Sequence, residues 1–370
     1  MFMAHDVIVV GGGLIGMITA RTLRLAGLDV VLLEKNRLGK QASWAAGGIL
    51  AKLHPWQQSE GMRKLIHAGQ AAFPGFVAEL QDETGVDSQL LQSGMLITNL
   101  EQQEAALAWG RKHRMQIELV HRSALAKLEP GLAKTIDAAL HVPSTMQVQP
   151  RLLIEATRKS LELHGVQVLE RVMVTGLHAK ASRLTGVETN HGSMHAGQVM
   201  LCNGAWAGQL LQTLSRGHTD IEPVRGQILL FKPSRPLLSR ILVSADHYLI
   251  PRNDLYILCG STMEHVGFDD TVTADARNSI HAQASKLCPQ LENEVPVKHW
   301  AGLRPGTARD VPYICVHPEF ENLYINAGHF RYGIVMSIPS AEIACDLVMD
   351  RPSAFQTGLY DWLHAGTGPR

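Results

Sequence analysis

The sequence has no excess of charge of either sign, because its 370 residues contain 34 Lys and Arg and 34 Asp and Glu. A protein that binds mainly nucleic acid or an acidic membrane surface usually carries a basic excess. We therefore expect neither as the main partner. Hydrophobic residues make up 45% of the chain and charged residues 18%, which is typical of a globular protein.

Long apolar runs are also missing from the chain. No segment approaches the roughly 18 apolar residues that a membrane-spanning helix needs. The segment from Met1 to Asp6 leads straight into an apolar strand pattern, with no basic stretch followed by a cleavable apolar one. These features predict a soluble, cytoplasmic protein with no spanning membrane segment.

Cysteines are few, and they are dispersed without a C-x-x-C pattern at positions 202, 259, 288, 315 and 345. An odd and dispersed set is typical of reduced thiols in a cytosol. The 18 histidines are dispersed too, and no H-E-x-x-H pattern appears among them. We therefore expect no metal site.

The beginning of the chain has the pattern of a dinucleotide-binding unit. The apolar segment 7–10 predicts a strand, and the glycine turn 11–16 fits G-x-G-x-x-G. A helix is then predicted over 14–25, followed by a second strand over 30–33 that ends at Glu34. A glycine turn alone is weak evidence, but here the strands, the helix and the acid all have the expected spacing.

Each glycine of this turn has its own expected role. Gly11 allows the tight turn, Gly13 lets the backbone approach the pyrophosphate, and Gly16 lets the helix pack close to the strand. Backbone N–H groups in the first helical turn, at Leu14 and Ile15, would bind the anion together with the helix dipole. The carboxylate at the end of the second strand would accept hydrogen bonds from ribose hydroxyls.

The length and the later patterns predict an α/β protein with two domains. Segment 198–202 is an apolar run that suits a buried parallel strand. Between 223 and 300 the pattern becomes alternating and β-rich, which suits antiparallel strands in a sheet with one open face. We therefore predict a discontinuous Rossmann-like domain (1–80, 145–222 and 301–370) with an inserted antiparallel β-rich domain (81–144 and 223–300).

Several segments carry a family resemblance: the turn 11–16 with Glu34 and Lys35, and the segments 42–50, 223–227, 302–307 and 327–334. With these segments the sequence resembles the glycine oxidase and D-amino-acid oxidase family of FAD-dependent oxidoreductases over nearly the whole chain. Gly-Leu-Arg-Pro-Gly-Thr at 302–307 and Ala-Gly-His-Phe-Arg-Tyr-Gly-Ile at 327–334 are the most specific segments. They resemble bacterial glycine oxidases more than D-amino-acid dehydrogenases or the eukaryotic oxidases.

The resemblance implies FAD as the cofactor, held in the Rossmann-like domain, while the inserted domain holds the substrate. Small residues at 45–48 would let the backbone lie against a flat ring system, and the turn before the last helix would face the flavin with its N–H groups. The expected cofactor-binding residues are Gly11, Gly13, Leu14, Ile15, Gly16, Glu34, Lys35, Gln41, Ala42, Ser43, Ala46, Gly47, Gly48, Ile49, Val174, Gly204, Trp206, His329, Phe330, Arg331, Tyr332, Gly333 and Ile334.

FAD is expected to be non-covalent. Related sarcosine oxidases attach the flavin to a cysteine in the turn after the carboxylate-binding segment. Here residues 302–312 contain no cysteine, and Cys315 lies a few residues too late.

Arg304 is the first candidate for binding the substrate, because the planar guanidinium of arginine pairs bidentately with a carboxylate. It matches the carboxylate-binding arginine of the family. By resemblance, Tyr248 would bind the other side of the carboxylate, Arg331 would lie near the amine or the flavin edge, and Met263 would form a pocket wall. No catalytic acid or base pair stands out, which suits direct hydride transfer from Cα to flavin N5.

The resemblance, together with these residues, implies oxidative deamination of glycine, sarcosine or small D-amino acids to a 2-oxo acid and ammonia or an amine. Dioxygen would reoxidise the flavin and yield hydrogen peroxide. A dehydrogenase that passes electrons to a quinone or another carrier is the alternative enzyme, and a non-catalytic flavoprotein subunit is the alternative outside enzymes. By resemblance, the protein would be a homo-oligomer, such as a homotetramer, and would act in thiamine precursor synthesis.

Overall fold

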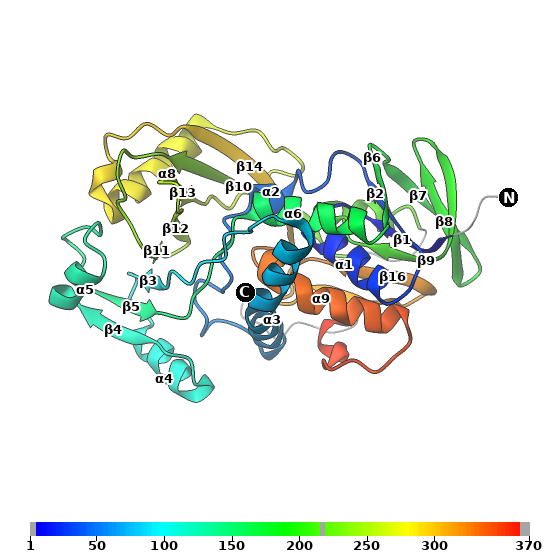
Figure 1. The fold of residues 1–370 in the computed structure, drawn as a ribbon, viewed down its shortest axis with the longest axis horizontal. Helices are drawn as coiled ribbons and strands as arrows, with labels where there is room; N and C mark the ends of the chain where they lie inside the picture. Colours follow the sequence, from blue (N-terminus) through cyan, green and yellow to red (C-terminus); the bar gives the residue numbers. More distant parts are fainter. Residues whose placement is uncertain (1–4, 215–218, 363–370) are drawn as a thin grey trace.

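The computed structural model describes residues 5–214 and 219–362, whose strands form two eight-stranded sheets that lie side by side (Figure 1). The strands of the first sheet are β1 (His5–Val10), β2 (Val30–Glu34), β6 (Gln167–Glu170), β7 (Val174–Lys180), β8 (Arg183–Thr189), β9 (Gly192–Leu201), β15 (Tyr313–His317) and β16 (Phe320–Ala327). The main order is β15-β16-β9-β1-β2-β6, and the hairpin of β7 and β8 is joined through β9. From β16 to β6 the neighbouring strands are parallel.

Both faces of the first sheet are covered, which is why its central strands are continuous apolar runs. On one face, Val7 and Val9 belong to a buried cluster that includes residues of helices α1 (Leu14–Leu25), α3 (Glu60–Thr84), α6 (Pro150–Leu163) and α9 (Gly333–Val348). On the other face, Ile8 and Val10 pack against β7, β8 and the short helix α7 (Ala207–Leu211). The expected helix over 14–25 and the expected second strand are confirmed.

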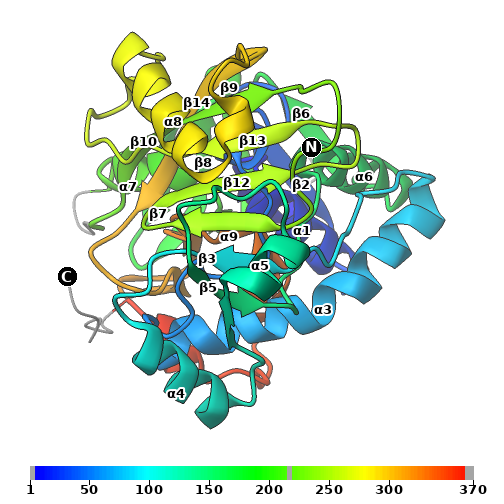
Figure 2. The same cartoon turned by 90° about the vertical axis from the view of Figure 1, so that its left-hand side faces the viewer.

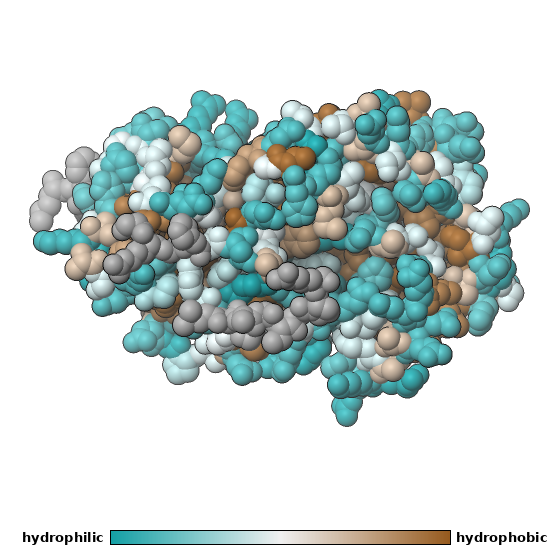
Figure 3. All heavy atoms as spheres, turned by 180° about the vertical axis from the view of Figure 1, so that it is seen from behind, coloured by the Kyte–Doolittle hydropathy of each residue, from teal (hydrophilic) through white to brown (hydrophobic). Residues whose placement is uncertain are grey.

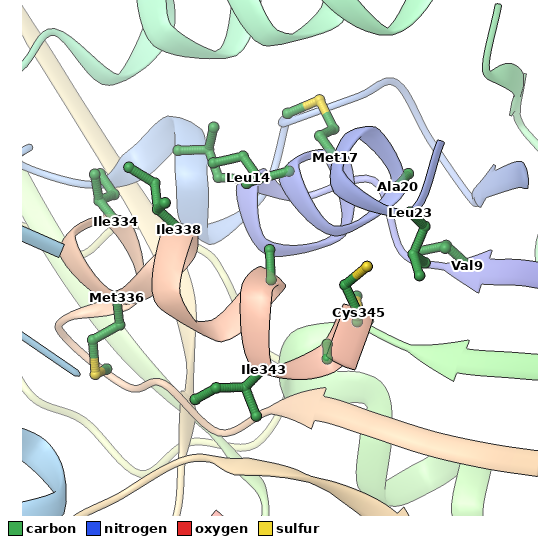
Figure 4. Close-up of a cluster of buried hydrophobic side chains, with 14 of the residues drawn as sticks. Val9, Leu14, Met17, Ala20, Leu23, Ile334, Met336, Ile338, Ile343 and Cys345 are labelled. Atoms are coloured by element: carbon green, nitrogen blue, oxygen red, sulfur yellow. The ribbon is translucent and has the colours of Figure 1, made fainter. Parts of the chain in front are cut away.

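Helices α1 and α9 come from opposite ends of the chain and lie against each other. Figure 4 shows Leu14, Met17 and Leu23 of α1 in one cluster with Ile338 of α9 and Val9 of β1, and all of them are buried. The beginning of each helix follows a turn at the same end of the sheet, where the parallel strands end. This packing places two helix N-termini at one site.

The strands of the second sheet are β3 (Met95–Ile97), β4 (Glu118–His121), β5 (Ala138–Val142), β10 (Glu222–Phe231), β11 (Ile241–Ser244), β12 (His247–Pro251), β13 (Ile257–Gly260) and β14 (Lys298–Gly306). Their order is β14-β10-β13-β12-β11-β3-β5-β4. All neighbours are antiparallel except β3 and β11, which are parallel, so the expectation of an antiparallel sheet is correct with one exception. The expected domain boundary at 300/301 falls within β14, which pairs with β10 along its whole length.

The expectation that this sheet has one open face is wrong, because both faces are covered. On one face lies helix α8 (Ala274–Leu287), whose Ile280 packs against Leu229 and Phe231 (Figure 2). On the other face, Ile228 and Leu230 are buried in a second apolar cluster. Thr273 begins α8 by accepting a hydrogen bond from the N–H of Ala276. The other helices of this region are α4 (Gln103–His113) and α5 (Arg122–Leu128), and the remaining short helices are α2 (Ala42–Ala45), η1 (Gly204–Trp206), η2 (Pro289–Leu291) and η3 (Thr357–Tyr360).

Figure 3 shows a mostly hydrophilic face with small, separate hydrophobic areas. Within residues 5–214 and 219–362, no helix combines the length and the apolar character needed to cross a membrane.

The α3–α9 contact provides a test of the close packing in the first domain. A Cβ added at Gly69 of α3 would lie 1.7 Å from the carbonyl oxygen of Val335, whereas nothing lies within 4 Å of one added at Gly75 of the same helix. Gly69→Ala should therefore lower the stability by about 1–3 kcal/mol through overpacking. Gly75→Ala should raise it by about 0.5–1 kcal/mol through helix propensity. Urea unfolding midpoints measure both effects, and equal shifts for the two variants would contradict this packing.

Candidate active site

A cavity of about 570 Å³ is lined by both sheets and by the turns at their facing ends. Its volume lies in the range of about 300–1,000 Å³ that is usual for cofactor and ligand sites. From the first domain it takes the turn after β1, the ends of β2 and β9, and the segments 41–49, 172–175 and 326–334. From the second sheet it takes residues of β10, β12 and β14.

The turn between β1 and α1 has the geometry of an anion-binding cradle. Gly11 adopts a φ of +106°, and a Cβ at Gly16 would lie 1.8 Å from the carbonyl oxygen of Gly11. The N–H of Leu14 donates to the Ser43 hydroxyl at 2.9 Å, and α1 has no acidic residue in its first turn. The positive end of this helix therefore faces the cavity without a carboxylate of its own.

Glu34 is buried at the end of β2, with 8% of its surface exposed. Its two carboxylate oxygens accept hydrogen bonds from the backbone N–H groups of Gly12 (2.7 Å) and Asn36 (2.8 Å). These bonds fix the carboxylate beside the glycine turn. Each oxygen keeps further acceptor capacity, because an ionised carboxylate can accept about four hydrogen bonds in all.

Two buried acceptors along the cavity have no hydrogen-bond partner among the described residues. They are the side-chain oxygens of Asn203, in the turn after β9, and Asn326, near the end of β16. Buried polar atoms are rarely left without a partner, so these two oxygens suit a bound group that carries donors. Gly204 follows with a φ of +56°, and a Cβ at this position would meet nothing within 4 Å.

The segment 45–48 forms a fixed wall of the cavity. The Trp300 indole donates to the carbonyl oxygen of Ala45 at 3.1 Å. The Arg252 guanidinium donates to the carbonyl oxygens of Gly47 and Val148, the latter at 2.8 Å. Arg252 is buried without an ion-pair partner in the described part of the chain, and burial lowers its pKa to about 10. Charged donors to carbonyl groups make strong hydrogen bonds in such surroundings, so this wall is held firmly.

Arg304 projects from β14 into the part of the cavity that the second sheet lines. Its Nη2 donates to the Ser261 hydroxyl at 2.8 Å and its Nη1 donates to the carbonyl oxygen of Thr262 at 3.1 Å. A Cβ at Gly226 would lie 1.9 Å from Nη2, so the guanidinium rests directly on this glycine. Burial lowers the pKa of Arg304, and the nearby Tyr248 opposes that change.

No carboxylate pairs with Arg304 among residues 5–214 and 219–362. An arginine stays protonated in proteins, so its charge is left for a bound anion. Tyr248 lies on β12, is 8% exposed, and lines the same part of the cavity. The pair therefore offers a carboxylate a guanidinium and a phenol hydroxyl.

The turn before α9 closes the cavity from the first domain. Arg331 pairs with Asp246, with 2.7 Å between Nη1 and Oδ1. His329 donates to or accepts from the Ser340 hydroxyl at 3.0 Å, and burial lowers its pKa to about 3, so the imidazole is neutral. Helix α9 has neither an acidic residue in its first turn nor a side-chain cap. Its positive end therefore faces the cavity uncompensated.

Nearly all of the expected site residues line this cavity, including Arg304, Tyr248 and Arg331. Gly16 lies beneath the glycine turn, where its expected role was close packing. The expectation for Met263 as a pocket wall does not match the structure, because the residue does not line the cavity and is 47% exposed. The backbone of its neighbour Glu264 pairs with Arg225, and this pairing carries the segment away from the cavity.

Sequence reasoning did not find Arg252, Asn326 or Ser261. Arg252 and Ser261 follow short apolar strands, and Asn326 ends another, so no local pattern distinguishes them from ordinary strand ends. Gly226 lies within the recognised segment 223–227, and Asn203 directly follows the expected strand 198–202, but the roles of both depend on contacts with distant parts of the chain.

Comparisons with known proteins identify the class. Residues 6–347 match the family described as FAD dependent oxidoreductase. The chain is 39% identical to glycine oxidase of Pseudomonas aeruginosa over 97% of this chain and 98% of that protein. It is 38% identical to glycine oxidase of Pseudomonas putida, with coverages of 94% and 95%.

Among solved structures, the glycine oxidase of Geobacillus kaustophilus superposes with a TM-score of 0.93 at 27% identity, covering 98% of this chain and 99% of that one. The chain therefore belongs to the family of FAD-dependent oxidoreductases, and it is an enzyme with FAD as its cofactor.

The residues of the cavity fit FAD. The glycine cradle and the N-terminus of α1 suit the pyrophosphate, Glu34 suits the ribose, and the unpartnered oxygens of Asn203 and Asn326 suit donors of the cofactor. Cys202 also lines the cavity, but it is buried and burial raises the pKa of its thiol to about 12. Such a thiol is a poor nucleophile, so non-covalent attachment remains our prediction.

Replacing Arg252 by methionine tests whether this arginine holds the 45–48 wall in place for FAD. Arg252→Met leaves two buried carbonyl oxygens without their donor, so the 45–48 segment loosens and the Kd of FAD should rise about tenfold or more. Titration of the apoprotein with FAD, followed by flavin fluorescence, measures this constant. The control is Arg277→Met, which removes an exposed arginine from α8. A Kd for Arg252→Met within twofold of the control would contradict the proposed role.

Proposed function

We propose that this enzyme oxidises small amino acids that carry one carboxylate, namely glycine, sarcosine or small D-amino acids. The observation that carries the proposal is the guanidinium of Arg304, which lies in the cavity beside Tyr248 without an acidic partner among the described residues. The similarity to two Pseudomonas glycine oxidases over nearly the whole chain supports the same substrate class.

The carboxylate of the substrate would bind between Arg304 and Tyr248. Arg304 is already oriented by Ser261 and Thr262, so little side-chain freedom is lost when the substrate binds. A bidentate arginine–carboxylate pair fixes direction as well as position. This orientation would hold Cα at a defined place along the cavity, and positioning of this kind supplies much of the rate in hydride transfer.

Burial makes the histidines near this site weak bases. It lowers the pKa of His329 to about 3 and the pKa values of His54 and His247 below the ordinary histidine value. The substrate amine would therefore lose its proton to the solvent before Cα is oxidised. Bound FAD would supply the acceptor for the hydride from Cα, with dioxygen then taking the electrons as hydrogen peroxide. Water would hydrolyse the imino acid to the 2-oxo acid and ammonia or an amine.

The positive end of α9 would assist by favouring negative charge beside the turn 329–333. The backbone N–H groups at Gly333 and Ile334 are the first of the helix and have no intrahelical partner by position. They line the cavity and face no acidic side chain in the first turn. We further propose that the enzyme acts as a cytoplasmic homo-oligomer in the supply of a thiamine precursor, as the family resemblance implies.

Two other functions give different results in one experiment. The holoenzyme is mixed anaerobically with glycine, sarcosine or D-alanine, and the flavin absorbance is followed. Our proposal expects bleaching by at least one of these compounds and hydrogen peroxide when air is admitted. Bleaching without peroxide would indicate a dehydrogenase that uses another electron acceptor. Absence of bleaching with a broad panel of amino acids would indicate a non-catalytic flavoprotein and would overturn the proposal.

Arg304→Leu tests the carboxylate anchor. Removing one partner of a buried charged pair costs about 2–5 kcal/mol, so kcat/KM should fall about 100-fold or more, mainly through KM. Steady-state kinetics with the best wild-type substrate measure the change. Arg277→Leu provides the control, because that arginine is exposed on α8. Unchanged saturation by substrate in Arg304→Leu would refute the anchor.

The pH dependence provides a second test of the chemistry. Arg304 keeps its charge across the working range, and His329, with a pKa of about 3, does not titrate there. The neutral fraction of the substrate amine therefore controls kcat/KM, which should rise about tenfold per pH unit until the pKa of the amine is approached. Initial rates at low substrate concentration measure this profile. A flat profile from mildly acidic to alkaline pH would show that the protonated amine is used.

A further inference from the structure

Three cationic side chains lie close together where the substrate would bind. Arg304 and Arg331 line the cavity itself, and Lys52 is close enough to Arg331 for that guanidinium to lower the pKa of the lysine. Lys52 is 3.4 Å from Asp310, and Arg331 is 2.7 Å from Asp246. In the described part of the chain, Arg304 is therefore the one cation of the three without a carboxylate partner.

The pair of Arg331 and Asp246 joins the two sheets at the cavity. Asp246 lies in the turn between β11 and β12, two residues before Tyr248, and Arg331 lies in the turn between β16 and α9. Besides the ion pair, Nη2 of Arg331 donates to the backbone oxygen of Asp246 at 3.2 Å. The arginine side chain is 13% exposed and the aspartate side chain 60% exposed. Arg331 is thus held on the cavity side, with the acid toward solvent.

The ion pair with Asp246 neutralises Arg331, which is a second guanidinium in the cavity besides Arg304. A guanidinium that lines the cavity near Arg304 and Tyr248 could bind a second carboxylate of a substrate. Asp246 already occupies Arg331, and its own negative charge repels another anion that approaches the same place. A hydrogen atom or a methyl group at that end of the substrate meets no such repulsion.

We infer that Asp246 determines substrate specificity by occupying Arg331, so that amines with a single carboxylate are accepted and dicarboxylic amines are rejected. This inference rests on the proposed oxidation of small amino acids. It assigns to Asp246 the restriction to substrates with one carboxylate. Asp246 is a positioning residue, because it acts through Arg331.

Sarcosine and iminodiacetate form a matched pair of test compounds, because the second replaces a hydrogen of the N-methyl group by a carboxylate. The measured quantity is the ratio of kcat/KM for iminodiacetate to that for sarcosine at low ionic strength. Asp246→Asn keeps the shape and the hydrogen bond but removes the charge, so the ratio should rise about tenfold or more. Asp246→Ala, which also removes the hydrogen bond, should raise it at least as much.

Two further variants separate the proposed role from a general loss of charge or structure. Asp346→Asn breaks a comparable aspartate–arginine pair, with Arg351, near the other end of α9. About 13 residues of helix separate it from the cavity, or about 20 Å, so the ratio should stay at the wild-type value. Arg331→Leu combined with Asp246→Asn should abolish the gain. A ratio unchanged by both substitutions at Asp246, or a gain that persists without Arg331, would overturn the inference.

Binding of unreactive analogues tests the inference independently of turnover. Diglycolate and methoxyacetate replace the amine nitrogen by oxygen, and their Kd values follow from perturbation of the flavin spectrum of the holoenzyme. Asp246→Asn should strengthen the binding of diglycolate relative to that of methoxyacetate about tenfold. If no amino acid bleaches the wild-type flavin, the proposed function fails, and this binding ratio still decides the role of Asp246. An unchanged ratio would reject that role.

Discussion

The hydrogen bonds of Arg252 hold the cavity together, because they join the second sheet to two segments of the first domain, one of which forms a wall of the cavity. One guanidinium, at the end of β12, reaches the carbonyl oxygens of Gly47 and Val148 and the side chain of Gln147. These segments are about 100 and 200 residues distant along the chain, so only the folded state brings them together. Because Arg252 is buried without a counter-ion in the described structure, the carbonyl dipoles must compensate its charge.

Arg304 is also held by hydrogen bonds to neighbouring groups, but its charge is not compensated within the described part of the chain. Ser261 and Thr262 orient this guanidinium but leave its charge uncompensated, which is unfavourable for the folded protein and favourable for binding an anion. Gly226 makes the arrangement possible, since any larger residue would displace the side chain. Two arginines of the second sheet therefore have different functions: Arg252, just after β12, binds backbone oxygens, and Arg304, on β14, is free to bind a ligand.

Local patterns in the sequence were sufficient where one segment determines its own structure. The glycine turn, the helix over 14–25 and the place of Glu34 at the end of β2 depend on neighbours within one βαβ unit, and these positions were predicted correctly. Helix α8 was missed because its buried residues at 276, 280, 284 and 287 include two alanines among polar residues. The roles of Arg252, Asn203 and Asn326 depend on distant partners, and Met263 was misplaced because its direction depends on how the segment after β13 leaves the sheet. No local pattern contains this information.

The interleaving of the two sheets has a consequence for how the polypeptide acquires its structure. Strand β1 is flanked by β2 and by β9, and β9 in turn pairs with β16, about 300 residues after the chain begins. During synthesis, the central strands of the first sheet must wait for most of the protein to leave the ribosome. High separation between pairing segments slows folding and prolongs the exposure of apolar edges. A chain of this topology should depend strongly on chaperones while it is being made.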